Sequence, residues 1–235
     1  MKKIITAVLI LFLSLSISSF AKPKAIKILP LGDSITCASP YKLSYRYPLW
    51  KHLVDAEKNI EFIGSQKQKS NGYRKWENYK NHKFSEANEC HSGWRADRIL
   101  HRASGIDQWL KTYTPDIALI HLGTNDMYQN QTPVSTVDEI KKIITKLRGK
   151  NPRIKILVAK IIPLYTNPLV PRLNQLISEL TKTITTSQSP VAIVDMYSGF
   201  SISTYMQKDK IHPNAKGEEL MAKRWFDALM KNNFL

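Results

Sequence analysis

A serine and a histidine far apart in the chain have the residue types and settings for nucleophilic catalysis. Ser34 follows Gly-Asp at the end of a short apolar run, and His212 lies three residues after Asp209. The Asp-x-x-His spacing lets the carboxylate accept the Nδ1 proton of His212, so that Nε2 can face a hydroxyl as a base. A serine is a nucleophile only with such a base in reach. These residues would allow Ser34 to act as a nucleophile; the alternative is that Ser34 or Asp33 caps the next helix.

Asn125 is placed to stabilise the oxyanion that such an attack creates. It lies in Gly123–Asp126, a polar turn that follows another apolar run. A side-chain N–H beside a nucleophile stabilises a tetrahedral intermediate. Asp33 and Asp126, the acids of the two turns, are expected to hydrogen-bond turn amides. The six histidines show no His-Glu-x-x-His spacing, so we expect no metal site and no cofactor.

The elements that must position these residues follow from the hydrophobic pattern. Apolar runs that end at Gly, Pro or Asp predict five strands, at 25–31, 60–63, 117–122, 154–162 and 191–194. Helical patterns cover 49–57, 96–110, 135–148, 171–185 and 214–230, with Ser135 as an N-cap candidate. This alternation predicts a three-layer α/β/α sandwich around a five-stranded, mostly parallel sheet. Ligands bind at the carboxyl ends of such strands, where Ser34 and Asn125 fall. The stretch 66–91 is expected to be a surface loop.

Four short blocks, taken together, resemble the SGNH/GDSL hydrolases. In chain order they are Gly32-Asp33-Ser34, Gly93 within His91-Ser92-Gly93-Trp94, Gly123-Thr124-Asn125-Asp126 and Asp209-x-x-His212. Each block is unspecific alone, and the resemblance rests on their joint occurrence between Lys27 and the last helical segment. It implies an SGNH hydrolase-like α/β fold and ester hydrolysis through an acyl-enzyme.

The resemblance implies a role for each matching residue. Ser34 would be the nucleophile, and the oxyanion would be bound by the backbone N–H groups of Ser34 and Gly93 and by the Asn125 side chain. His212 would be the base, oriented by Asp209. Asp195 also follows a strand and could orient a histidine, but the block spacing favours Asp209, and Asp is a common turn residue.

Three segments are similar to a carbohydrate-esterase branch of the family that includes acetylxylan esterases. They are Leu29–Thr36, Tyr45–Leu49 and His91–Trp94. The resemblance implies an O-acetylated sugar as substrate. Trp94 could then stack on a sugar ring or pack in the core, and Arg46 could reach a polar substrate group or form a salt bridge at a helix start. The alternatives are a lysophospholipase or thioesterase for longer acyl chains, and a binding protein without activity.

Cys37 and Cys90 are the two cysteines, and each lies three residues from a block position, Ser34 or Gly93. The blocks must meet around one oxyanion, which brings the two cysteines close together. We therefore expect a disulfide beside the active site, with two separate buried thiols as the alternative.

The N-terminus has the features of an export signal. Lysines, an apolar run and small residues ending at Ala21 predict a signal peptide over 1–21, followed by a single domain over 22–235. The alternative, a membrane anchor, requires a longer apolar run. Export would place the protein in the periplasm or the medium. The net charge of +16 suits anionic envelope surfaces, whereas the dispersed basic residues and the absence of a recognition motif argue against nucleic acid.

Overall fold

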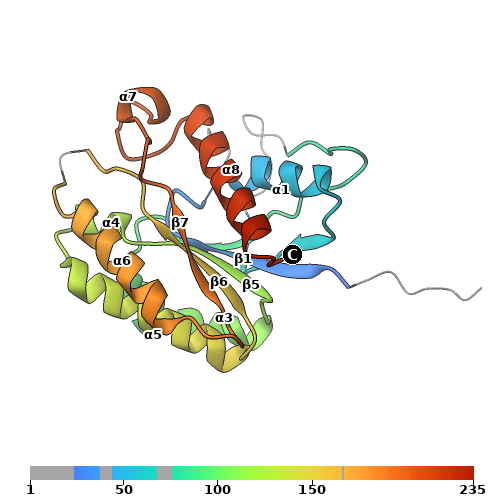
Figure 1. Cartoon of the computed structure of the whole chain (residues 1–235), viewed down its shortest axis with the longest axis horizontal. Coiled ribbons are helices and arrows are strands. Elements are labelled where there is room, and N and C mark those ends of the chain that lie inside the picture. Colours follow the sequence, from blue (N-terminus) through green and yellow to red (C-terminus); the bar gives the residue numbers. More distant parts are fainter. Residues whose placement is uncertain (1–23, 38–43, 68–75, 166) are drawn as a thin grey trace, which may run out of the picture.

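A mostly parallel β-sheet is the centre of the computed structural model, which describes residues 24–37, 44–67, 76–165 and 167–235 (Figure 1). The five predicted strands are β1 (Ile26–Gly32), β2 (Ile60–Phe62), β5 (Ile117–His121), β6 (Lys155–Lys160) and β7 (Val191–Asp195). The central pairings β1–β5, β5–β6 and β6–β7 are parallel, and β2 pairs in parallel with the first half of β1. The predicted signal peptide, 1–21, lies outside the described residues.

The expectation of a surface loop over 66–91 is wrong at both ends of that stretch. β3 (Gln66–Lys67) pairs antiparallel with β4 (Ala87–Cys90), and β4 pairs in parallel with the last two residues of β1. The hydrophobic pattern did not predict β4, because this strand carries the polar residues Asn88 and Glu89. Both are buried, and their side chains form hydrogen bonds. The stretch 68–75 lies outside the described residues.

Helices cover both faces of the sheet, which confirms the three-layer sandwich (Figure 1). One face is covered by α1 (Arg46–Asp55) and α8 (Ala215–Lys231), and the other by α2 (Ala96–His101), α3 (Ile106–Thr112), α5 (Pro133–Lys150) and α6 (Val170–Ile184). Two short helices, α4 (Thr124–Tyr128) and α7 (Ile202–Tyr205), were not predicted. The N-cap of α5 is Thr132 and not Ser135, because the Thr132 side chain accepts from the Ser135 N–H at 3.1 Å and Pro133 begins the helix.

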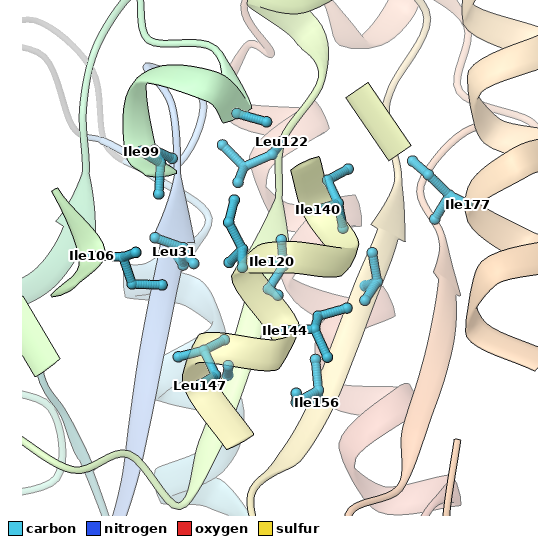
Figure 2. Close-up of a cluster of buried hydrophobic side chains, with 14 of the residues drawn as sticks. Leu31, Ile99, Ile106, Ile120, Leu122, Ile140, Ile144, Leu147, Ile156 and Ile177 are labelled. Carbon is cyan, nitrogen blue, oxygen red and sulfur yellow. The ribbon is translucent and has the colours of Figure 1, made fainter. Parts of the chain in front are cut away.

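The core on the α5 side fixes the ends of the strands that carry the polar turns. Figure 2 shows side chains of β1, β5 and β6 packed against those of α5; they include Leu31, Ile120, Ile156, Ile140 and Ile144. All are at most 1% exposed. Burial of each such side chain stabilises the fold by about 1.5–3 kcal/mol. The turns at the carboxyl ends of β1 and β5 therefore start from rigid positions.

Candidate active site

Ser34 lies in a tight turn at the carboxyl end of β1. Gly32 begins the turn, and a Cβ there would be 2.8 Å from the His121 carbonyl oxygen on β5, so only glycine allows the close approach. Asp33 is buried, and its Oδ1 accepts from the Ile35 N–H at 2.9 Å, as expected of a turn acid. Burial raises the pKa of Asp33 to about 6. The turn leaves Ser34 half-buried at the edge of the sheet.

His212 lies between Ser34 and Asp209 and contacts both. Its Nε2 is 2.9 Å from Ser34 Oγ, and its Nδ1 is 2.9 Å from Asp209 Oδ2. Asp209 Oδ1 accepts from the backbone N–H groups of Ile211 and His212, each at 3.0 Å. Partial burial acts to raise the pKa of Asp209, but these donors and the His212 side chain outweigh it and hold that pKa well below its usual range. An ionised carboxylate at Nδ1 favours the tautomer whose Nε2 can accept the serine proton.

Asp195 and Arg46 form contacts with residues other than Ser34, His212 and Asp209. Asp195 Oδ2 accepts from Lys160 Nζ at 3.0 Å, and its Oδ1 accepts from turn amides. Arg46 is completely buried, and its Nε donates to the Thr36 carbonyl at 2.9 Å and its Nη1 to that of Glu86 at 3.1 Å. Its guanidinium therefore supports the turn after Ser34 from inside, and the substrate contact considered for Arg46 stays a prediction.

Gly93 and Asn125 lie on two segments that contact each other and the Ser34 turn. The His91 N–H donates to the Gly32 carbonyl at 3.0 Å, and Asn125 Nδ2 donates to the Trp94 carbonyl at 3.1 Å. Gly93 has a φ of +76°, which favours glycine. Among the hydrogen bonds of the described residues, none uses the backbone N–H of Ser34 or Gly93. Two backbone donors, on segments that contact each other through the His91–Gly32 hydrogen bond, are thus available to a ligand.

The expected disulfide is present and joins the two backbone segments. Cys37 and Cys90 are bonded, with their Cα atoms 5.3 Å apart. Cys37 follows Ser34 closely, and Cys90 ends β4, directly beside Gly32. The bond therefore holds the loop of Gly93 against the turn of Ser34.

We expect the double substitution Cys37→Ser/Cys90→Ser to lower the free energy of unfolding by about 4 kcal/mol, because the bond closes a long loop. The two cysteines are 53 residues apart. Urea unfolding of the oxidised wild type and the variant measures the difference, and reduced wild type should match the variant. Equal unfolding midpoints for oxidised and reduced protein would contradict a stabilising bond.

Asp126 holds the start of α2 in place. Its two carboxyl oxygens lie 3.1 and 3.3 Å from the Ala96 N–H, and the residue is completely buried. Burial raises its pKa to about 7, from an ordinary value of 3.8. Because α2 directly follows the segment of Gly93 and Trp94, Asp126 fixes that segment from behind.

Between pH 4 and 7 the Asp126 carboxyl is protonated in the folded protein and ionised in the unfolded chain, so unfolding releases a proton. The contribution of Asp126 to the free energy of unfolding should therefore fall as the pH rises through this range. Asp126→Asn keeps the shape and removes the titration. We expect the free energy of unfolding of the variant, relative to wild type, to increase by about 3 kcal/mol between pH 4 and 7. Urea unfolding at both pH values tests this, and Asp138→Asn, an exposed acid, is the control. A pH-independent difference for Asp126→Asn would refute the expectation.

A buried polar cluster that the hydrophobic pattern missed supports the loop of Gly93. Glu89 is completely buried and accepts from the Ser65 N–H at 2.9 Å and from Tyr113 Oη at 2.5 Å. Its Oε1 is 2.8 Å from His91 Nε2. The His91 ring in turn stacks on Trp94, with centroids 4.2 Å apart. The only sequence signal for this cluster was a charged residue two positions before His91.

Trp94 is half-buried and packs within the protein. Besides His91, its ring contacts the Arg102 guanidinium, whose Cζ is 4.7 Å from the ring centroid. Its carbonyl accepts from Asn125. A sugar contact by the exposed part of this ring stays a prediction.

Comparison with known proteins assigns the chain to a family. Residues 31–220 match the family model of GDSL-like lipases and acylhydrolases. The chain belongs to this GDSL-like family. A multidomain esterase of Ruminococcus flavefaciens is 28% identical over 224 residues, which are 87% of this chain and 28% of that protein. The GDSL-like chain thus spans about 28% of the length of this relative.

Three solved structures similar to this GDSL-like protein are described as esterases. A crystal structure of an acetyl esterase mutant with an acetate ion and a family 3 carbohydrate esterase from Talaromyces cellulolyticus each have a TM-score of 0.77 and 28% identity, over 88% of this chain and 97% of theirs. A family 3 carbohydrate esterase of Clostridium thermocellum has a TM-score of 0.73 and 26% identity, over 88% of this chain and 96% of its own. The family and these relatives favour the interpretation as an ester hydrolase over that as a binding protein without activity.

Proposed function

We propose that this GDSL-like esterase removes O-acetyl groups from a carbohydrate, with Ser34, His212 and Asp209 as its catalytic triad. The observation that carries the proposal is the position of His212, 2.9 Å from both Ser34 Oγ and Asp209 Oδ2. These distances suit transfer of the serine proton to Nε2 while the carboxylate binds the Nδ1 proton.

In the proposed reaction Ser34 Oγ attacks the acetyl carbonyl carbon and His212 Nε2 takes the serine proton. The backbone N–H groups of Ser34 and Gly93 and the Asn125 amide bind the oxyanion. The tetrahedral intermediate collapses, the sugar oxygen leaves, and His212 returns the proton to it. Water, deprotonated by the same nitrogen, then attacks the acetyl-enzyme and releases acetate with Ser34 restored.

The acetyl and carbohydrate parts of the proposal are supported by the relatives. The solved structures at 26–28% identity are described as an acetyl esterase and as carbohydrate esterases. The resemblance of the His91–Trp94 segment to the same branch supports this substrate class independently of the structures. The competing substrate, a lipid or thioester with a longer acyl chain, is an outcome of the test.

The test compares initial rates on aryl acetate, butyrate, octanoate and palmitate, and acetate release from acetylated xylo-oligosaccharides. We expect the acetate ester to be the fastest aryl substrate and the oligosaccharide to be deacetylated. Rates that rise with chain length, with no acetate released from the saccharide, would overturn the proposal in favour of lipid or thioester substrates.

Asn125→Ala should lower kcat by about 100- to 1000-fold, because one donor to the oxyanion is lost. The KM should change little, since the oxyanion forms only after binding. Because Asn125 also binds the Trp94 carbonyl, thermal unfolding of the variant is measured beside its kinetics. A loss of activity that appears only in KM would argue against a role at the oxyanion.

We also propose that residues 1–21 are removed on export and that 22–235 form a single domain in the periplasm or the medium. In the described part of the chain no helix is long and apolar enough to cross a membrane, and no group of three or more His, Cys, Asp or Glu side chains could hold a metal ion. N-terminal sequencing of the protein from the periplasm or the medium tests the cleavage, and an intact Met1 would refute it.

A further inference from the structure

A groove of about 960 Å³ lies beside the turn that presents Asp209 and His212. Its walls are the loops after β6 and β7, the region of α7, and the segment that follows α7 (Figure 1). The aromatic, polar and basic side chains that line it include Tyr165, Tyr197, Phe200, Gln207, Lys208 and Lys210. A concave surface with aromatic walls and a few polar groups is typical of a binding site for an extended ligand.

One wall of the groove and the base of the triad belong to the same closed turn. The Gln207 N–H donates to the His212 carbonyl at 2.9 Å, and Gln207 Nε2 donates to the Pro213 carbonyl at 2.6 Å. The Lys210 N–H donates to the Gln207 carbonyl at 3.0 Å. The groove wall and the proposed base are therefore held in a fixed position relative to each other.

The groove carries positive charge without matching carboxylates. Lys208 and Lys210 are both exposed, and neither forms an ion pair within the described part of the chain. Asp209 lies between them in sequence, but its carboxylate contacts His212. Asp195, at the end of β7, is paired with Lys160 at 3.0 Å. Asp209 and Asp195 thus already have partners and do not neutralise the two lysines.

Lys210 is held in a position that costs backbone energy. Its φ is +56°, in the left-handed region where a side chain is disfavoured by about 1–2 kcal/mol. Its Nζ lies 3.8 Å from the centroid of the Tyr165 ring, and Tyr165 is 52% exposed. A cation and an aromatic face are therefore displayed together at the groove. Strained backbone that displays a charged side chain in this way points to a function.

We infer that this groove binds the carboxylates of acidic sugar residues, so that the preferred substrate of the esterase is an acidic, O-acetylated saccharide. Lys208 and Lys210 bind uronic acid carboxylates by charge-assisted hydrogen bonds, and the exposed tyrosine face packs against the apolar face of a sugar ring. The excess of basic over acidic residues, which remains after removal of residues 1–21, attracts a polyanionic chain from a distance. The inference rests on the proposed function only in taking the cleaved ester to be on a saccharide.

Binding is tested without turnover in the Ser34→Ala protein, with a hexamer of galacturonic acid and its fully methyl-esterified, neutral counterpart as probes. We expect the acidic hexamer to bind more tightly, and Lys208→Gln/Lys210→Gln to weaken its binding by about 10-fold. The control Lys141→Gln/Lys182→Gln removes the same charge from exposed positions on α5 and α6 and should bind like the parent. No binding of the acidic hexamer, or equal binding by the groove variant, would overturn the inference.

Kinetics with active protein separate this inference from the proposed function. We expect Lys208→Gln/Lys210→Gln to lower the ratio of kcat/KM for acidic over neutral acetylated oligosaccharides, a ratio in which effects on the triad cancel. If the wild-type protein has equal kcat/KM for acidic and neutral oligosaccharides, the proposed role of the groove is wrong and the esterase proposal is unaffected. Hexamer binding that depends on the lysines, in a protein that deacetylates no saccharide, would overturn the proposed function. Inorganic polyphosphate that binds the groove as tightly as the hexamer would overturn the saccharide assignment.

Discussion

Ser34→Ala is expected to lower kcat for aryl acetate hydrolysis by about 10⁴- to 10⁶-fold, because no covalent intermediate can form without Oγ. The residual rate would come from the oxyanion donors and from substrate binding. Ser34 is half-buried, and its Oγ contacts only His212 in the described part of the chain. The variant should therefore unfold at nearly the wild-type temperature, so that kinetics report chemistry and not folding.

A matched serine and a second triad variant make this result specific. Ser187→Ala changes an exposed serine away from the site and should keep full activity. An organophosphonate should label the wild type and Ser187→Ala once, and leave Ser34→Ala unlabelled. His212→Ala combined with Ser34→Ala should be no slower than Ser34→Ala alone, since the two residues act as a unit. A Ser34→Ala protein within 10-fold of the wild-type rate would require another nucleophile.

Asp209→Asn is expected to lower kcat by about 10³-fold. An amide at this position can donate to Nδ1, which stabilises the tautomer with its proton on Nε2 and disables the base. Fully buried acids in such triads cost about 10⁴-fold when replaced by Asn. The Asp209 side chain is 38% exposed, so water can substitute for part of its interaction with His212. Steady-state kinetics of the variant on aryl acetate measure the effect.

Asp195→Asn distinguishes the two acids weighed for this role. Asp195 contacts Lys160, Ser198 and turn amides, and within the described part of the chain it forms no hydrogen bond or ion pair with His212. We therefore expect Asp195→Asn to keep kcat within a few-fold of wild type, with any loss appearing in stability. A larger loss of kcat in Asp195→Asn than in Asp209→Asn would show that the orienting acid has been misassigned.

The pattern of the sequence predicted most of the fold because buried parallel strands are apolar throughout. Short continuous apolar runs such as 117–122 are typical of buried strands. Each of the predicted strands is present. The pattern failed at β4, where Asn88 and Glu89 are buried and paired by hydrogen bonds. A period-based analysis assigns such residues to the surface, because it contains no information on their partners.

The sequence by itself determined the family, the fold class and the two turns that end β1 and β5, since these follow from local residue types and block order. Only the tertiary structure decided which groups meet. Ser34 and His212 are 178 residues apart, yet their side chains are in hydrogen-bond contact because both lie at the carboxyl edge of one sheet. The same packing buries Arg46 beneath the Ser34 turn and leaves Lys208 and Lys210 at an open groove. Burial and partners depend on the whole fold, so no local spacing could separate a buried arginine from exposed lysines.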